Sequence, residues 1–81
     1  MEKKLEIRKF IVQNFLYGQD DGFQNGDSLL DMGLIDSTGV LELVSFVEEN
    51  FKINVNDEEI VPENFDSVDN LEKFINWKEI L

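Results

Sequence analysis

The chain has 81 residues, enough for one small domain, and carries 18 acidic against 7 basic side chains, a net charge of −11. This charge argues against nucleic acid or anionic membrane as a partner, because both are bound through basic side chains. The absence of cysteine and histidine removes disulfides, thiol nucleophiles, the usual transition-metal sites and histidine general bases. No lysine or arginine lies between Lys9 and Lys52, so the central part of the chain is strongly acidic.

The first predicted helix covers residues 1–17, where apolar side chains recur at helical spacing. Its apolar stripe consists of Ile7, Phe10, Ile11 and Phe15. Gly18 is placed to end this helix in a left-handed conformation. The apolar runs of the chain are too short for a signal peptide or a membrane span, so we expect a cytoplasmic protein without membrane insertion. We also expect a monomer.

A long loop over residues 18–36 follows, rich in glycine, asparagine and aspartate. A loop of this length in so small a domain is either functional or internally structured. We expect residues 28–32 to form a short helical turn, and four apolar side chains to hold the loop against the core: Phe23, Leu29, Leu30 and Met32. The acidic residues lack the spacing of a calcium-binding loop, so no metal site is predicted.

The second predicted helix covers residues 37–50. Asp36 and Ser37 are both good N-terminal caps, and the sequence leaves open which of them caps the helix. The apolar face consists of Val40, Leu43, Val44, Val47 and Phe51. The opposite face carries Thr38, Leu41, Glu42, Ser45, Glu48 and Glu49. The pattern predicts a serine hydroxyl exposed at the positive end of a helix, beside an acidic face.

Three elements are predicted in the last third of the chain. Residues 52–55 form an extended linker, and residues 57–61 form a short helix that Pro62 ends. A last helix begins at Asp66 or Ser67. Phe65 is expected just outside this last helix, as a contact with it. The apolar stripe of the last helix consists of Val68, Leu71, Phe74 and Ile75. In the tail, residues 76–81, we expect Trp77 and Ile80 to pack back onto the core. The sum is an all-α fold, a small four-helix bundle with three longer helices and one short one, forming a single domain over residues 1–81.

The centre of the chain combines three ordered motifs: Gly33-Leu34-Ile35-Asp36-Ser37, then Glu42-Leu43-Val44, then Glu48-Glu49-Asn50-Phe51. This combination resembles the acyl carrier protein family, in which Gly-Leu/Ala-(x)-Asp-Ser opens a helix that contains Glu-Leu-Val and ends in acid-acid-x-Phe. The resemblance extends over nearly the whole chain. It implies that Ser37 is the attachment point of a 4′-phosphopantetheine arm and that Asp36 supports the transferase that installs it. It also implies a partner surface formed by Thr38, Leu41, Glu42, Ser45, Glu48 and Glu49.

The resemblance implies a carrier and not an enzyme, with no catalytic residues of its own. An acyl or aminoacyl group would be attached to the arm as a thioester. The carrier would present this group to loading and transfer enzymes with basic docking patches. Thr38 stands where the common fatty-acid-synthesis pattern has leucine, and Gly39 where it has an acid. The sequence therefore looks more like discrete carriers of specialised pathways, including those that bear amino acids such as D-alanine. Any acyl pocket would lie among Val44, Val47, Ile60, Phe65 and Ile75, although these residues are also needed as plain core.

Two alternatives remain at this level. The chain could be an acidic interaction module without covalent cargo, in which Ser37 only caps the helix. A small hydrolase that uses Ser37 as its nucleophile is the weaker alternative, because the sequence offers no histidine and no evident lysine to activate the hydroxyl.

Overall fold

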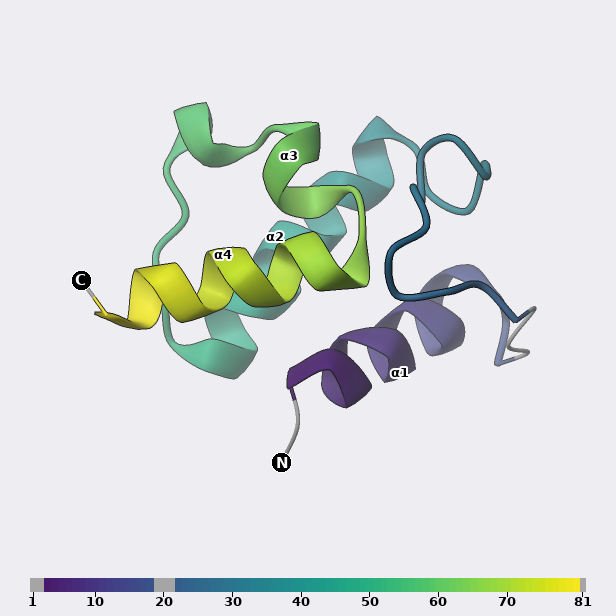
Figure 1. Cartoon of the computed structure of the whole chain (residues 1–81), viewed down its shortest axis with the longest axis horizontal. Helices are drawn as coiled ribbons and strands as arrows, with labels where there is room; N and C mark the ends of the chain where they lie inside the picture. Colours follow the sequence, from purple (N-terminus) through teal and green to yellow (C-terminus); the bar gives the residue numbers. More distant parts are fainter. Residues whose placement is uncertain (1–2, 19–21, 81) are drawn as a thin grey trace.

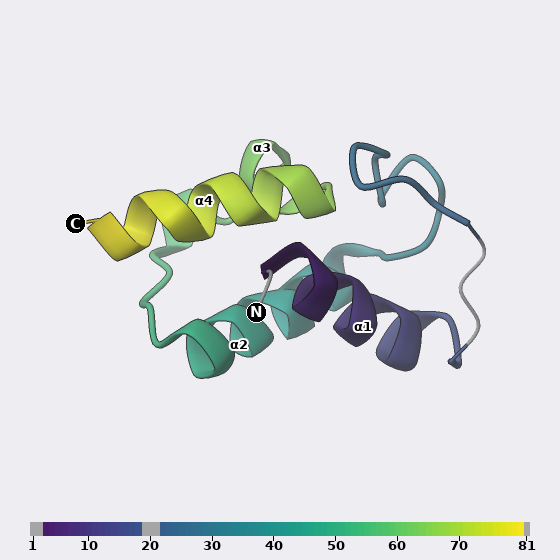
Figure 2. The same ribbon diagram turned by 60° about the horizontal axis from the view of Figure 1, so that its bottom comes forward.

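The computed structural model describes residues 3–18 and 22–80, and within these residues it contains helices but no strand. The elements, in chain order, are α1 (Lys3–Phe15), α2 (Ser37–Phe51), the single 3₁₀ turn η1 (Asp57–Glu59), α3 (Pro62–Phe65) and α4 (Val68–Ile80). Figure 1 shows α4 in front of α2, with α1 below them and α3 beside the start of α4. Seen from below in Figure 2, α4 and α3 lie on one side of the molecule, and α1 and α2 lie on the other. The predicted all-α bundle of three longer helices and one short helix is confirmed.

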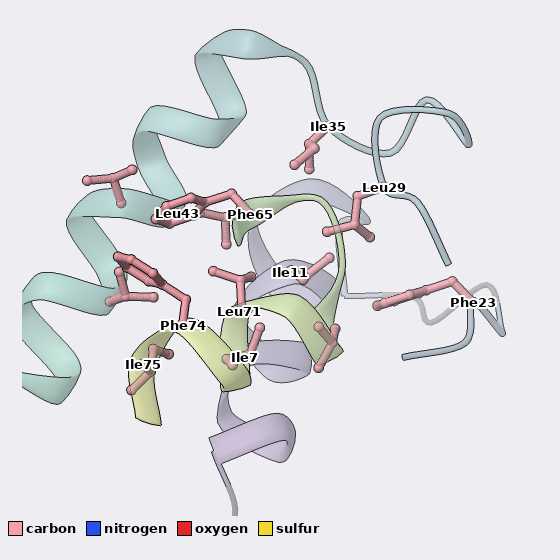
Figure 3. Close-up of a cluster of buried hydrophobic side chains, with 13 residues drawn as sticks. Ile7, Ile11, Phe23, Leu29, Ile35, Leu43, Phe65, Leu71, Phe74 and Ile75 are labelled. Carbon is pink, nitrogen blue, oxygen red and sulfur yellow. The ribbon is translucent and has the colours of Figure 1, made fainter. Parts of the chain in front are cut away.

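The core lies between the three longer helices and also receives side chains from α3 and from the loop before α2. Helix α1 contributes Ile7 and Ile11, and the stacked rings of Phe10 and Phe46, 4.3 Å apart, join α1 to α2 at its edge. The predicted stripes of α2 and α4 face this core, and its most buried members are Leu43, Val47, Val68, Leu71 and Ile75. Figure 3 shows that side chains of the loop before α2 also point into it. Burial of these side chains is the main stabilising term for so small a domain.

The long loop is fixed to the helices by a few specific contacts. Phe23 and Leu29 are buried, as predicted. The guanidinium of Arg8 on α1 lies 4.0 Å from the centre of the Phe23 ring and donates a hydrogen bond of 2.8 Å to the Phe23 carbonyl. Leu30 and Met32, however, are 36% and 45% exposed. The prediction that they hold the loop to the core is wrong, because Leu29 and Phe23 already fill the space that faces the helices.

The first helix ends at Phe15, two residues before the predicted end. Tyr17 and Gly18 both adopt positive φ angles, of 54° and 85°, and the Gly18 N–H donates to the Val12 carbonyl at 2.9 Å. The left-handed turn predicted at Gly18 therefore includes Tyr17 as well. The predicted start of this helix at residues 1–2, the loop residues 19–21 and the last tail residue, 81, lie outside the described part of the chain.

Pro62 begins a helix instead of ending one. The turn η1 closes at Glu59, and Pro62 is the first residue of α3, where a missing N–H costs nothing and the fixed φ angle suits the helix. Phe65, expected just outside the last helix, is the final residue of α3 and is 1% exposed, with its ring 5.4 Å from that of Phe74. The short α3 therefore anchors itself in the core through one aromatic side chain.

Helix α4 begins directly after Ser67, whose hydroxyl accepts a hydrogen bond of 3.0 Å from the Asn70 N–H and so caps the helix. It continues through Ile80, so the predicted tail is helical. Trp77 and Ile80 are 50% and 82% exposed. The expectation that both pack back onto the core is wrong for Ile80, which lies on the face of a continuous helix that points away from Leu71 and Ile75. Trp77 only borders the core, with its ring centre 6.1 Å from that of Phe74.

Glu59 gives the fold a testable dependence on pH. The backbone N–H of Asn56 and then Lys78 of α4 donate to its carboxylate, which lowers the pKa of Glu59 below its usual value. A lowered pKa stabilises the folded state above the usual carboxyl pKa, and this contribution is lost as the pH falls through the folded value. Urea unfolding should therefore show that Glu59→Gln lowers the midpoint at pH 7 but lowers it less at a pH below the folded-state pKa of Glu59, where the wild-type side chain also takes up a proton. An equal difference at both pH values would contradict this assignment.

Candidate functional site

Ser37 is the first residue of α2 and lies exposed at the surface. The carboxylate of Asp36, and not the Ser37 hydroxyl, caps the helix by accepting a hydrogen bond of 2.8 Å from the Gly39 N–H. This settles the choice that the sequence left open. The Ser37 hydroxyl makes no hydrogen bond to any residue within 3–18 or 22–80. It is therefore available for chemistry at the positive end of a helix of 15 residues.

The approach to Ser37 is held in place by the end of the loop. Ile35, 6% exposed, points into the core just before the cap, as Figure 3 shows. The Leu34 N–H and the Ile35 N–H both donate to the Leu29 carbonyl, at 3.0 and 3.4 Å. Gly33, with a φ of 73°, provides the turn that leads into this segment. The position of Ser37 is thus set by a buried side chain and by backbone hydrogen bonds within the loop.

Gly39 has a packing role that sequence reasoning did not detect. A Cβ atom at this position would lie 3.0 Å from Cε1 of Phe15 and 3.2 Å from Cβ of Ile35. The lack of a side chain lets the end of α1 and the loop press directly against the first turn of α2. In the sequence, Gly39 stands out only as the replacement of an acid, and an acidic side chain would not fit here without displacing Phe15 or Ile35. The signal was present, but only the tertiary contact explains it.

The predicted partner surface lies along the outer side of α2. Five of its six members are exposed: Thr38, Leu41, Glu42, Ser45 and Glu49. Glu48 is half-buried, and its carboxylate accepts a hydrogen bond of 2.9 Å from the Val55 N–H. That carboxylate therefore holds the linker after α2 in place and is less available to a partner than those of Glu42 and Glu49.

A groove of about 480 Å³ opens beside Ser37, between the start of α2 and α3. It is lined by Leu30, Ser37, Val40, Leu41, Ile60, Val61, Pro62 and Phe65. Only Ile60 and Phe65 belong to the set of residues expected for an acyl pocket. The other three members, Val44, Val47 and Ile75, are buried core residues. These three residues therefore serve as plain core, the alternative that the sequence left open, and the groove that the structure contains lies nearer to Ser37 and to the surface.

A second hollow lies on the other side of the helix tip and includes Asp36, Thr38 and Glu42. Within the described residues, no cluster of three or more aspartate, glutamate, histidine or cysteine side chains could hold a metal ion. Helices long and apolar enough to cross a membrane are also lacking there. The site thus consists of one exposed hydroxyl, one capping carboxylate, an acidic helix face and an apolar groove.

Comparison with known proteins places this chain in a family. No protein-family model matches the chain. A relative, named probable acyl carrier protein PigG, of Serratia sp. (strain ATCC 39006), is 31% identical over 61 residues, which cover 75% of this chain and 70% of that protein. The chain belongs to the acyl carrier protein family. Acyl carrier proteins are carriers and not enzymes, and members of the family generally bear a phosphopantetheine arm.

Proposed function

We propose that this acyl carrier protein bears its 4′-phosphopantetheine arm on Ser37 and presents an acyl or aminoacyl group to partner enzymes as a thioester at the end of that arm. The observation that carries the proposal is the exposed Ser37 hydroxyl, which the Asp36 cap leaves without a structural task. The arm supplies the thiol that this cysteine-free chain lacks. Tethering the cargo raises its effective concentration at each enzyme that binds the carrier.

The helix start suits the product of this modification. Esterification of Ser37 places a phosphodiester anion at the first turn of α2, where free N–H groups and the helix dipole favour negative charge by about 0.3–1 kcal/mol. Asp36 uses one carboxylate oxygen for its bond to Gly39. Its second oxygen makes no hydrogen bond to the described residues and is placed to support the transferase, through a magnesium ion that the transferase would bring.

The sequence around Ser37 favours a specialised pathway over housekeeping fatty-acid synthesis. Thr38 is exposed directly beside the attachment residue, and Gly39 is locked in contact with Phe15. Both positions depart from the fatty-acid-synthesis pattern, and the second departure is built into the packing of the domain. A partner adapted to that pattern would meet a different surface here.

Incubation with coenzyme A and a broad-specificity phosphopantetheinyl transferase, followed by intact-mass measurement, tests the proposal. The wild-type protein should gain the mass of one phosphopantetheine, and peptide mapping should place it on Ser37. A protein that gains no mass would instead fit the acidic interaction module. Turnover of a generic ester by the unmodified protein would support the hydrolase.

Reversing charge on the outer face of α2 should slow the encounter with basic partner enzymes. Glu42→Lys with Glu49→Lys changes two exposed acids and leaves the bond from Glu48 to Val55 intact. We expect the association rate with the transferase to fall about tenfold or more at low salt, because steering by opposite charge accounts for such factors. Stopped-flow measurements at two ionic strengths provide the readout, and the difference should shrink at high salt.

A matched control reverses the same amount of charge away from Ser37. Glu58→Lys with Glu63→Lys alters two exposed acids that border a separate hollow around Trp77. This variant should retain most of the wild-type association rate. Equal slowing by both variants would show that only net charge matters and would contradict steering by the α2 face.

A further inference from the structure

Asp66, between α3 and α4, is bonded to a turn of the long loop. One oxygen of its carboxylate accepts a hydrogen bond of 2.9 Å from the Leu30 N–H, and the other accepts one from the Ser28 hydroxyl. The Asp66 carbonyl accepts a third hydrogen bond, of 2.7 Å, from the Leu29 N–H. Three consecutive loop residues are therefore bonded to one residue that lies 36 to 38 positions later in the chain.

Asp66 is itself firmly placed. Its N–H donates to the Pro62 carbonyl at 2.9 Å, and its neighbours Phe65 and Ser67 are both buried. The backbone of Asp66 is thus fixed between the end of α3 and the start of α4. A carboxylate on such a backbone is a preordered acceptor, and hydrogen bonds to a carboxylate are stronger than those between neutral groups.

The same turn supports the segment that leads to Ser37. The Leu29 carbonyl accepts hydrogen bonds from the N–H groups of Leu34 and Ile35, the two residues before the helix cap. A continuous series of hydrogen bonds therefore leads from Asp66 through Leu29 to the start of α2. The segment includes Gly33, which loses more backbone freedom than other residues when it is ordered, so these bonds offset a real loss of entropy.

We infer that Asp66 is a positioning residue for the modification of Ser37: its hydrogen bonds to residues 28–30 hold the segment before α2 in the arrangement that presents the Ser37 hydroxyl. The inference rests on the proposed function and adds to it a residue that does not line the groove at Ser37. Without these bonds, only a fraction of the molecules would present Ser37 correctly, and the apparent affinity for the transferase would fall by that fraction. The burial of Ile35 is the competing anchor of the segment.

The test compares Asp66→Ala with Asp66→Asn and Ser67→Ala. Asp66→Ala removes both carboxylate bonds and keeps the bond from the Leu29 N–H to the backbone carbonyl. In Asp66→Asn, the side-chain amide can still accept from the Leu30 N–H and can donate to the Ser28 oxygen, so both contacts can persist. Ser67→Ala is the matched control, because it removes the hydrogen bond that caps α4 and leaves the bonds of Asp66 intact.

The first measurement is amide hydrogen exchange in the unmodified protein by NMR, which needs no transferase. We expect Asp66→Ala to speed exchange at Leu34 and Ile35 about tenfold relative to Val47 in the buried part of α2, and Asp66→Asn to stay within about twofold of the wild type. Ser67→Ala should leave this ratio unchanged. If Asp66→Ala does not fold, Ser28→Ala replaces it, since it removes one of the two carboxylate bonds and should speed the same two amides by a smaller factor.

The second measurement is the rate of phosphopantetheine labelling over a range of carrier concentrations. Asp66→Ala should raise KM about threefold to tenfold with little change in kcat, because the segment must be ordered on binding but reacts normally once it is bound. Ser67→Ala should keep the wild-type KM although it lowers the free energy of unfolding. This pair separates a loss of positioning from a loss of overall stability.

The inference is overturned if Leu34 and Ile35 exchange alike in Asp66→Ala and the wild type, because the burial of Ile35 would then suffice to place the segment. It is also overturned if Ser67→Ala raises KM as much as Asp66→Ala does. A wild-type protein that is not labelled would refute the proposed function. The exchange data alone would then support or overturn the role of Asp66 in holding the segment.

Discussion

Ser37→Ala should abolish phosphopantetheine labelling entirely while leaving the domain folded. The reason is that the variant lacks the only atom to which the arm would be esterified, whereas the helix keeps its cap through the bond from Gly39 to Asp36. Ser37 is exposed, so its loss should change the free energy of unfolding by no more than about 0.5 kcal/mol. Intact mass after incubation with coenzyme A and a transferase measures the first effect, and urea unfolding measures the second.

Ser45→Ala is the matched control for this prediction. Ser45 lies exposed on the same helix, and its replacement should leave the extent of labelling unchanged. Asp36→Ala separates capping of the helix from attachment of the arm. It removes the cap and leaves the Ser37 hydroxyl in place, and it should lower the free energy of unfolding by about 0.5–2 kcal/mol. Labelling of Ser37→Ala to the wild-type extent would disprove the attachment site. Unfolding of Ser37→Ala would show that the hydroxyl has a structural role that its exposure contradicts.

Phe65→Ala should cause one of the largest losses of stability available in this chain. The side chain is 1% exposed, contacts the ring of Phe74 and anchors the four-residue α3 to the core. Truncating such a phenylalanine costs about 3–5 kcal/mol, because transfer free energy is lost and a cavity remains. A domain of this size is stable by only about 4–12 kcal/mol, so the variant should be close to unfolding. Thermal and urea unfolding provide the measurement.

Ile80→Ala is the control for this second prediction. It truncates an apolar side chain that is 82% exposed at the end of α4, and it should change stability by no more than about 0.5 kcal/mol. Similar losses in both variants would mean that α3 is not anchored through Phe65. The wall that α3 contributes to the groove at Ser37 would then lack its support.

Features that depend on neighbouring residues alone were predictable from the sequence. The stripes of α1, α2 and α4 follow from helical spacing, and the start of α2 follows from Asp36-Ser37 with apolar residues behind it. The exposed serine at the helix tip follows from the same local pattern. The family could also be inferred, because its motif is a continuous stretch of sequence.

Features that depend on competition for space in the core were not predictable. Leu30, Met32, Trp77 and Ile80 are as apolar as the residues that are buried, but other side chains already occupy the core positions that they were expected to fill. Pro62 could end one helix or begin another, and the burial of Phe65 selects the second arrangement. Nothing in the neighbouring sequence requires glycine at position 39, and the reason for it is the contact with Phe15 from α1.

The sequence alone therefore determined an all-helical acidic domain with a serine at the start of its second helix, since helical periodicity and capping act over only a few residues. The tertiary structure decided which residues surround that serine. It brings Leu30 of the loop and α3 to the start of α2, through the hydrogen bonds of Asp66 and the burial of Phe65. The bond between Leu30 and Asp66 joins residues 36 positions apart, and a contact of that separation leaves no periodic trace in a single sequence.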